Sequence, residues 1–118
     1  MQKVAIVILA DTTPADGLGR VVNGLMAAKE FKDAQDDVRV IFTGAGTRWI
    51  GELSNPEPKL HGVYTELQDS IVGACGFCAG AFGVADSVKA SGVNLLEEYG
   101  TNMSFRRLLQ NGYPVIAF

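Results

Sequence analysis

The chain has 118 residues, 10 Lys plus Arg against 13 Asp plus Glu, and a net charge of −3. This length fits one domain spanning residues 1–118, and 47% hydrophobic residues are enough for a sizeable core. A scattered, mildly acidic charge argues against nucleic-acid binding. Since no apolar run approaches the roughly 20 residues of a membrane span, we expect a cytoplasmic protein that does not bind membranes.

Buried strands alternate with helical patterns from the start of the chain. Residues 3–10 are continuously apolar and rich in β-branched side chains, which is typical of a strand buried on both faces. A helix ending near Asp33 follows, because apolar residues recur at helical spacing at Leu18, Val21, Val22, Leu25 and Met26. Residues 38–43 form the second predicted strand, and residues 44–47 turn out of it.

Two short helices are predicted between the second and third strands. The first carries Trp49, Ile50 and Leu53 and ends at Asn55-Pro56. Pro58 suits the first turn of the second helix, whose apolar positions are Leu60, Val63, Tyr64 and Leu67. We expect Trp49 in the core or at an interface, and His61 on a helix surface.

The remaining elements are short. Residues 70–75 are the third strand, residues 76–91 contain a helix that is firm over 84–91, and residues 93–96 are a fourth strand. Ser104 is a good N-cap for a helix over 105–109, and residues 115–118 are the last strand. The pattern predicts a three-layer α/β/α domain with a mainly parallel sheet of four to five strands.

Ligand chemistry in such sheets lies beyond the carboxyl ends of the strands. Three segments reach that edge, and they supply candidate ligand-binding residues: Asp11, Thr12, Gly44, Gly46 and Gly76. The glycine turn lacks a phosphate-binding fingerprint, so no nucleotide or other cofactor is expected. A loop aspartate before a helix is usually a cap, and a role as acid or base is the alternative.

Cys75 and Cys78 are the candidate catalytic residues. Cys75 ends the third strand, and Cys78 lies in the first turn of the helix that follows, where the helix dipole favours a reactive thiolate. Neighbouring glycines keep the segment sparse, so that a partner's sulfur has room to approach. Simple packing of two small thiols is the alternative. A metal site is not expected, because C-x-x-C supplies two ligands and structural zinc takes four.

Residues 70–84, SIVGACGFCAGAFGV, resemble the DsrE/DsrF-like family of sulfur-relay proteins. Members show an apolar strand ending in Cys and a helical segment closing on Gly plus an aliphatic residue. Cys75 and Gly83-Val84 occupy those positions here. The order of the other elements, including the strand after Gly112-Tyr113-Pro114, fits the same family.

The resemblance implies a Rossmann-like domain that assembles as a homo-oligomer, a trimer or hexamer. It also implies a sulfur carrier or sulfurtransferase whose persulfide, placed on Cys75, passes from a donor protein to an acceptor protein. Cys78 is an addition to the family pattern, and we expect it to assist or to close a disulfide with Cys75. Trp49, Phe77 and Phe82 beside glycine-rich turns are consistent with an interface.

Two other functions stay open at this point. One is a dithiol/disulfide redox protein that uses Cys75 and Cys78, since C-x-x-C before a helix is the thioredoxin arrangement. The other is a non-catalytic oligomeric binding protein whose cysteines only pack.

Overall fold

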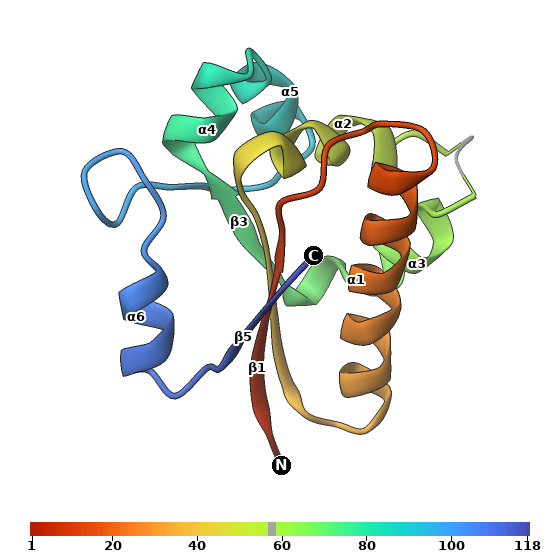
Figure 1. Cartoon of the computed structure of the whole chain (residues 1–118), viewed down its shortest axis with the longest axis vertical. Helices are drawn as coiled ribbons and strands as arrows, with labels where there is room; N and C mark the ends of the chain where they lie inside the picture. The colour runs from red at the N-terminus through yellow and green to blue at the C-terminus, as the bar shows by residue number, and fades with distance from the viewer. Residues whose placement is uncertain (57–58) are drawn as a thin grey trace.

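The protein is described by a computed structural model that covers residues 1–56 and 59–118. Five parallel strands form one sheet in the order β4-β3-β2-β1-β5 (Figure 1). The strands are β1 (Lys3–Ile8), β2 (Asp37–Phe42), β3 (Ile71–Cys75), β4 (Leu95–Leu96) and β5 (Val115–Ala117). The all-parallel sheet confirms the predicted fold class.

The described α-helices fall where the sequence predicted helical segments, whereas the two 3-10 helices occupy the turn predicted over 44–47 and the predicted start of the third strand at Ser70. The α-helices are α1 (Asp16–Asp33), α2 (Trp49–Leu53), α3 (His61–Glu66), α4 (Gly76–Ala81), α5 (Ala85–Ala90) and α6 (Phe105–Gln110), and two 3-10 helices are η1 (Gly44–Arg48) and η2 (Gln68–Ser70). The predicted start of a helix at Pro58 lies outside the described residues. Ser104 caps α6 as predicted, because its hydroxyl accepts a hydrogen bond from the Arg107 N–H.

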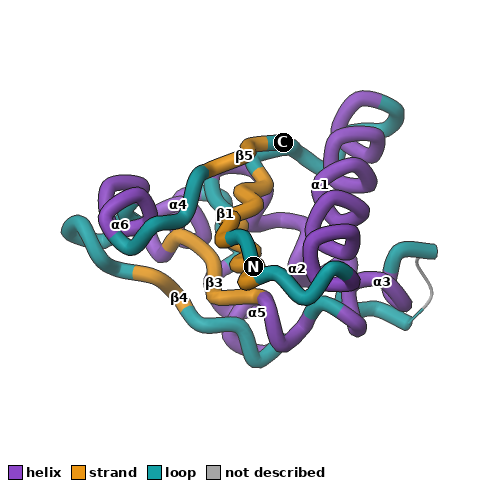
Figure 2. The backbone as a smooth tube through the Cα atoms, turned by 90° about the horizontal axis from the view of Figure 1, so that it is seen from below, coloured by secondary structure: helices purple, strands orange, loops and turns teal. Residues whose placement is uncertain are grey.

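Side-chain alternation along the central strands divides the core into two clusters. Ile6 and Ile8 of β1 pack with α1 and with buried residues of α2, α3, α4 and α5. Ala5 and Val7 of the same strand face the other way, toward Leu108 of α6. Figure 2 shows α1 and α6 on opposite sides of the sheet. The α6 side is the thinner layer of the domain.

The chain path explains why one layer is thin. From β1 to β4 the strands are added in sequence order toward one edge, with the intervening helices packed in the α1 cluster. After β4 the chain crosses the opposite face through α6 and adds β5 beside β1. The segment between β4 and α6 therefore runs over the carboxyl end of β3.

The buried face of α1 differs from the predicted stripe. Val21, Leu25 and Ala28 are fully buried, whereas Leu18 and Met26 are exposed. The helix approaches β1 closely at Gly24, where an added Cβ would lie 2.3 Å from the Ile8 side chain. Because a glycine lets α1 approach β1 closely, the face of α1 that contacts the sheet does not include the bulkier Leu18 and Met26.

The helical region over residues 76–91 is two helices. α4 ends at Ala81, and Gly83 then adopts a left-handed conformation with φ of +69° before α5 begins at Ala85. The firm part predicted over 84–91 corresponds to α5. The fourth strand is shorter than predicted, because only Leu95 and Leu96 pair with β3.

No helix among residues 1–56 and 59–118 is long and apolar enough to cross a bilayer.

Two glycines of α1 give a matched pair of tests for the helix position. A Cβ on Gly17 would lie 2.0 Å from the Asp11 carbonyl oxygen, whereas a Cβ on Gly19 meets nothing within 4 Å. Gly17→Ala should therefore lower the free energy of unfolding by about 1–3 kcal/mol, since backbone must move. Gly19→Ala should raise it by about 0.5–1 kcal/mol through better helix propensity. Urea unfolding measures both, and equal effects would contradict this packing.

Candidate functional site

The site is built on the carboxyl end of β3. Alternation turns Ala74 toward the α1 cluster and Cys75 toward the α6 cluster, where the cysteine packs with Met103 and Leu108. Cys78 follows in the first turn of α4 and packs against the same cluster. Both thiols are free. The two predicted catalytic residues are therefore together at one edge of the sheet.

The sulfur of Cys75 is surrounded by hydrogen-bonding groups. The Met103 N–H donates to Cys75 Sγ over 3.5 Å, and the Cys78 N–H donates to the same sulfur. As a thiol, Cys75 donates to Asn102 Oδ1 over 3.7 Å. A reversal of the Asn102 amide would present its NH₂ to a thiolate instead. We call the Met103 and Cys78 N–H groups the sulfur cradle.

Thr43 joins the cysteine pair from the end of β2. Its Oγ1 lies 3.6 Å from Cys78 Sγ and is itself buried. The Cys78 thiol and the Thr43 hydroxyl also hydrogen bond to the Cys75 sulfur. Two neighbouring strand ends thus supply donors to one sulfur atom.

These contacts set the ionisation of Cys75. Burial acts to raise the pKa of its thiol, but hydrogen bonds from the Cys78 N–H and the Met103 N–H lower it, as do those from the Cys78 and Thr43 side chains. The hydrogen bonds outweigh burial, so the pKa of Cys75 lies below its ordinary value. The arrangement therefore favours a thiolate, which is the nucleophilic form of cysteine.

The source of this stabilisation differs from the prediction. The sequence pointed to the N–H groups and the dipole at the start of the following helix, but α4 has only six residues and contributes little as a macrodipole. One donor is the backbone of Cys78, as expected for a first helical turn. The other, Met103, belongs to a segment 28 residues further along the chain.

A turn between β4 and α6 covers Cys75. The Thr101 carbonyl accepts a hydrogen bond from the Phe77 N–H over 2.7 Å, and the Tyr99 and Asn102 backbones bond to each other. We call residues 97–103 the cover segment. Gly76 makes room for it, since an added Cβ would lie 2.8 Å from Glu97 Cγ and 3.1 Å from the Thr101 oxygen. Gly76, predicted as a ligand-binding residue, is here a packing position.

Accessibility is reversed from the expectation for the two thiols. Cys75 is 1% exposed, whereas Cys78 is partly exposed and its neighbour Phe77 is 54% exposed. The strand end was expected to give a partner protein access to Cys75. The cover segment closes that route in the single chain, and the accessible sulfur is that of Cys78.

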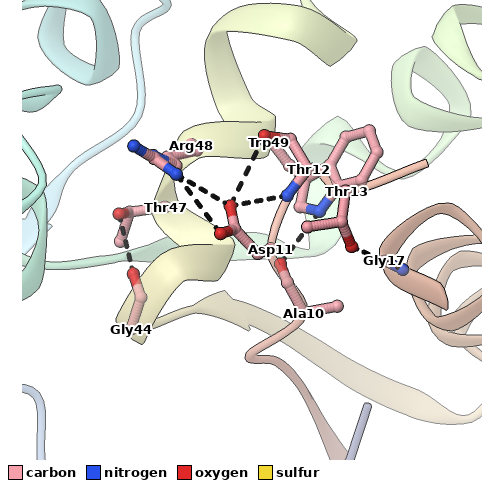
Figure 3. Close-up of polar contacts among 9 residues, drawn as sticks. All are labelled: Ala10, Asp11, Thr12, Thr13, Gly17, Gly44, Thr47, Arg48 and Trp49. Carbon is pink, nitrogen blue, oxygen red and sulfur yellow. Dashed lines mark hydrogen bonds and ion pairs between the residues drawn. The ribbon is translucent and has the colours of Figure 1, made fainter.

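Asp11 and Thr12, both predicted ligand-binding residues, form a polar cluster with Arg48 (Figure 3). The Asp11 carboxylate accepts from the Thr12 N–H over 2.7 Å and pairs with Arg48 Nη1 at 3.1 and 3.2 Å. These contacts, the Thr12 N–H first, hold the pKa of Asp11 below its usual value. Asp11 does not cap α1; the Thr13 hydroxyl accepts from the Gly17 N–H instead.

Arg48 links this cluster to the cysteine helix. Its guanidinium carbon lies 5.4 Å from the centroid of the Phe82 ring, at the end of α4. The Asp11 cluster is thus adjacent to α4, but its carboxylate is engaged by Arg48 rather than by the cysteines.

Gly44 and Gly46 serve the backbone in this structure. Gly44 has a φ of +56°, and its carbonyl accepts from the Thr47 hydroxyl. A Cβ on Gly46 would lie 2.1 Å from the Ile8 carbonyl oxygen, so η1 packs directly on the end of β1. Neither contact is evidence of a ligand, and both bring η1 beside the strand ends.

Trp49 and His61 have the structural roles that the sequence favoured, in the core and on a helix surface. Trp49 is buried in the chain, and its Nε1 donates to the Ala10 carbonyl over 2.9 Å. His61 is partly exposed on α3, with Nδ1 2.8 Å from the Leu53 oxygen. In the described part of the chain, no three His, Cys, Asp or Glu side chains are grouped to hold a metal ion.

Sequence reasoning missed Thr43, Asn102 and Met103. Thr43 had a signal, because it follows a buried strand and so lies at the same sheet edge as Cys75. Asn102 and Met103 had no such signal, since their contact with Cys75 Sγ depends on how the cover segment folds back.

A cavity of about 520 Å³ lies beside Met103, between the cover segment and α6.

Comparisons with known proteins agree with this architecture. The model of the DsrE/DsrF-like family matches residues 2–118. An uncharacterised protein of Methanocaldococcus jannaschii is 26% identical over 96 residues, which cover 81% of this chain and 78% of that protein. The solved structure of a conserved protein of unknown function from Bacteroides thetaiotaomicron has a TM-score of 0.63 at 20% identity, covering 97% of this chain and 94% of its own. This structural likeness shows the fold alone.

Removing the Thr43 hydroxyl should weaken the thiolate. In Thr43→Val the pKa of Cys75 should rise, because one of its hydrogen-bond donors is lost. The pH titration of the Cys75 ¹³Cβ chemical shift in reduced protein measures this. An unchanged or lower midpoint would show that the hydroxyl does not act on this sulfur.

The same shift has a consequence for stability. Because the folded-state pKa of Cys75 lies below its ordinary value, the ionised thiol stabilises the fold at a pH above that ordinary value. This contribution is lost as the pH falls through the folded-state value. The gain in urea midpoint on raising the pH through this range should therefore be smaller in Thr43→Val than in the wild type.

Proposed function

Because the chain belongs to the DsrE/DsrF-like family, we propose that it is a sulfur carrier, or a sulfurtransferase-like protein, that works through a cysteine persulfide on the Cys75–Cys78 pair. The observation that carries this proposal is the sulfur cradle. Two main-chain N–H groups converge on a cysteine sulfur at the strand-end position of the family pattern. A cytoplasmic location, where thiols stay reduced, is part of the proposal.

The chemistry needs a thiolate and nothing else from the protein. A thiolate attacks the terminal sulfur of a donor persulfide, R–S–SH, the donor S–S bond breaks, and the donor leaves as R–S⁻. The protein then carries the –S–SH group until an acceptor thiolate takes the terminal sulfur in the same way. No electrons are gained or lost overall, so no cofactor is required.

Exposed aromatic side chains beside the cysteines support contact with donor and acceptor proteins. Phe77 is 54% exposed and Phe82 is 40% exposed, and both lie on or at the end of α4 with Cys78. Exposed apolar side chains beside a reactive group are typical of transient protein contacts.

A dithiol/disulfide redox function is the second candidate. It is favoured by the hydrogen bond from the Cys78 thiol to the Cys75 sulfur, which places the two sulfurs side by side. Oxidation of the pair by a partner disulfide would form an internal disulfide, and the two electrons and two protons of the dithiol would pass to the partner, which becomes two thiols. A non-catalytic binding role is the third candidate, in which neither product forms.

We also propose that the chain forms a homo-oligomer, a trimer or hexamer. Two apolar side chains of α6, Phe105 and Leu109, remain exposed on the thin side of the sheet. A second copy would cover them. Trp49 gives no support to this proposal, because the chain itself buries it.

Sulfur loading tests the proposed function. Reduced protein incubated with a cysteine desulfurase and cysteine should gain the mass of one sulfur atom, and dithiothreitol should remove it. The double variant Cys75→Ser/Cys78→Ser should gain nothing. If no sulfur is added, but incubation with oxidised glutathione removes the mass of two hydrogen atoms, the redox function is supported. An unchanged mass in both incubations supports the binding role.

Light scattering tests the oligomer. At micromolar concentration the mass should be a multiple of three chains. Leu109→Asp, which places a charge on the exposed face of α6, should shift the mass toward one chain while circular dichroism is unchanged. A wild-type mass equal to one chain would contradict this proposal.

A further inference from the structure

We infer that the two cysteines divide the chemistry: Cys78 receives the sulfur from the donor persulfide, and Cys75 is the buried base that takes the Cys78 proton. This inference rests on the proposed function. It exchanges the roles that the sequence and the family pattern suggest, in which the persulfide is placed on Cys75.

Access to a donor molecule favours Cys78 as the attacking residue. An attacking sulfur must reach the terminal sulfur of a persulfide held on another molecule. Cys75 is 1% exposed beneath the cover segment, whereas Cys78 is partly exposed next to the exposed Phe77 ring. Only the sulfur of Cys78 meets a donor without movement of the cover.

The space around each sulfur also favours a persulfide on Cys78. The Met103 N–H, the Asn102 amide and the Cys78 N–H already surround Cys75 Sγ. Protein interiors are close-packed, so an added sulfur atom on Cys75 would displace one of these groups. The cover is itself fixed by the bond from the Phe77 N–H to the Thr101 carbonyl. An added sulfur on Cys78 extends toward its exposed side.

The contacts of the two thiols provide a route for the Cys78 proton to the Cys75 sulfur. The Cys78 thiol donates a hydrogen bond to the Cys75 sulfur, and the Thr43 hydroxyl contacts Cys78 Sγ at 3.6 Å. A thiol already bonded to a neighbouring sulfur needs no other base. The lowered pKa of Cys75 agrees with this, since it favours the deprotonated form of the acceptor sulfur.

The charged groups on the surrounding elements have other contacts, so Cys78 and Cys75 are the local acid and base. Glu97 of the cover segment packs on Gly76 and is exposed. Arg48 of η1 lies over Phe82 and is paired with Asp11 from the loop after β1. The contacts from β2 are made by Thr43, which does not titrate in the relevant range.

The steps balance. The proton of Cys78 moves to the Cys75 thiolate, and the Cys78 thiolate attacks the terminal sulfur of R–S–SH. The donor S–S bond breaks, R–S⁻ leaves, and Cys78 becomes –S–SH while Cys75 is a thiol. The departing R–S⁻ then takes the proton of Cys75, which restores the thiolate in its cradle. One sulfur atom has moved, and the total charge is unchanged.

Peptide mapping of the loaded wild-type protein tests the division directly. Glutathione persulfide is the probe, the free persulfide is trapped with an alkylating reagent, and mass spectrometry locates the extra sulfur. The proposal expects it on Cys78. Finding it on Cys75 would overturn the proposal while leaving the sulfur-carrier function intact. If the wild type takes up no sulfur, the proposed function itself fails, and this division of roles fails with it.

Single variants test the role of the base. Cys78→Ser should abolish loading. Cys75→Ser should still load on Cys78, with a rate lower by roughly 10²-fold near neutral pH, the low end for loss of a general base. Its pH–rate profile should differ from that of the wild type, because the base that takes the Cys78 proton is absent. A wild-type profile in Cys75→Ser, or loading of Cys78→Ser at the wild-type rate, would contradict the assignment. The mapping in wild-type protein stands even if Cys75→Ser is poorly folded.

Discussion

The hydrogen bond from the Met103 N–H to Cys75 Sγ joins parts of the chain that are 28 residues apart. It fixes the cover segment against the end of β3, and it places the sulfur of Cys75 out of reach of solvent. The same bond lowers the pKa of that sulfur despite its burial, since a buried thiolate without donors would be strongly disfavoured. Burial and ionisation of Cys75 thus have one common cause. The accessible position left for exchange with other molecules is Cys78.

This contact follows from the topology of the sheet. Strands β1 to β4 are laid down in order, and the chain then reverses across the other face to reach β5. The reversal carries residues 97–103 over the carboxyl ends of the strands, which is where ligand chemistry in parallel sheets occurs. Gly76 permits the close approach, because a larger residue would collide with Glu97 and the Thr101 carbonyl. The proposed site therefore lies on the thin side of the sheet.

Most of the fold could be predicted from the sequence because its elements have local signals. Continuous apolar runs marked β1, β2 and β3, and the N-cap of α6 at Ser104 was confirmed by its bond to Arg107. The buried face of α1 could not be predicted, since Gly17 and Gly24 let the helix approach the sheet and leave Leu18 and Met26 exposed. In the site, too, only the features with a local signal could be predicted. The pairing of Cys75 with Cys78 is local, whereas the burial of Cys75 depends on a distant segment that carries no motif.

The Thr101 carbonyl and the Met103 N–H hold the cover segment through its main chain, and the side chains of Glu98 and Asn102 add further hydrogen bonds. The Tyr99 side chain, in contrast, is 78% exposed. Substitutions at Tyr99 can therefore accumulate without disturbing the thiolate, provided that Gly100 keeps its left-handed conformation. The surface above the cysteine pair can thus vary in sequence while the main-chain contact to Cys75 beneath it stays the same.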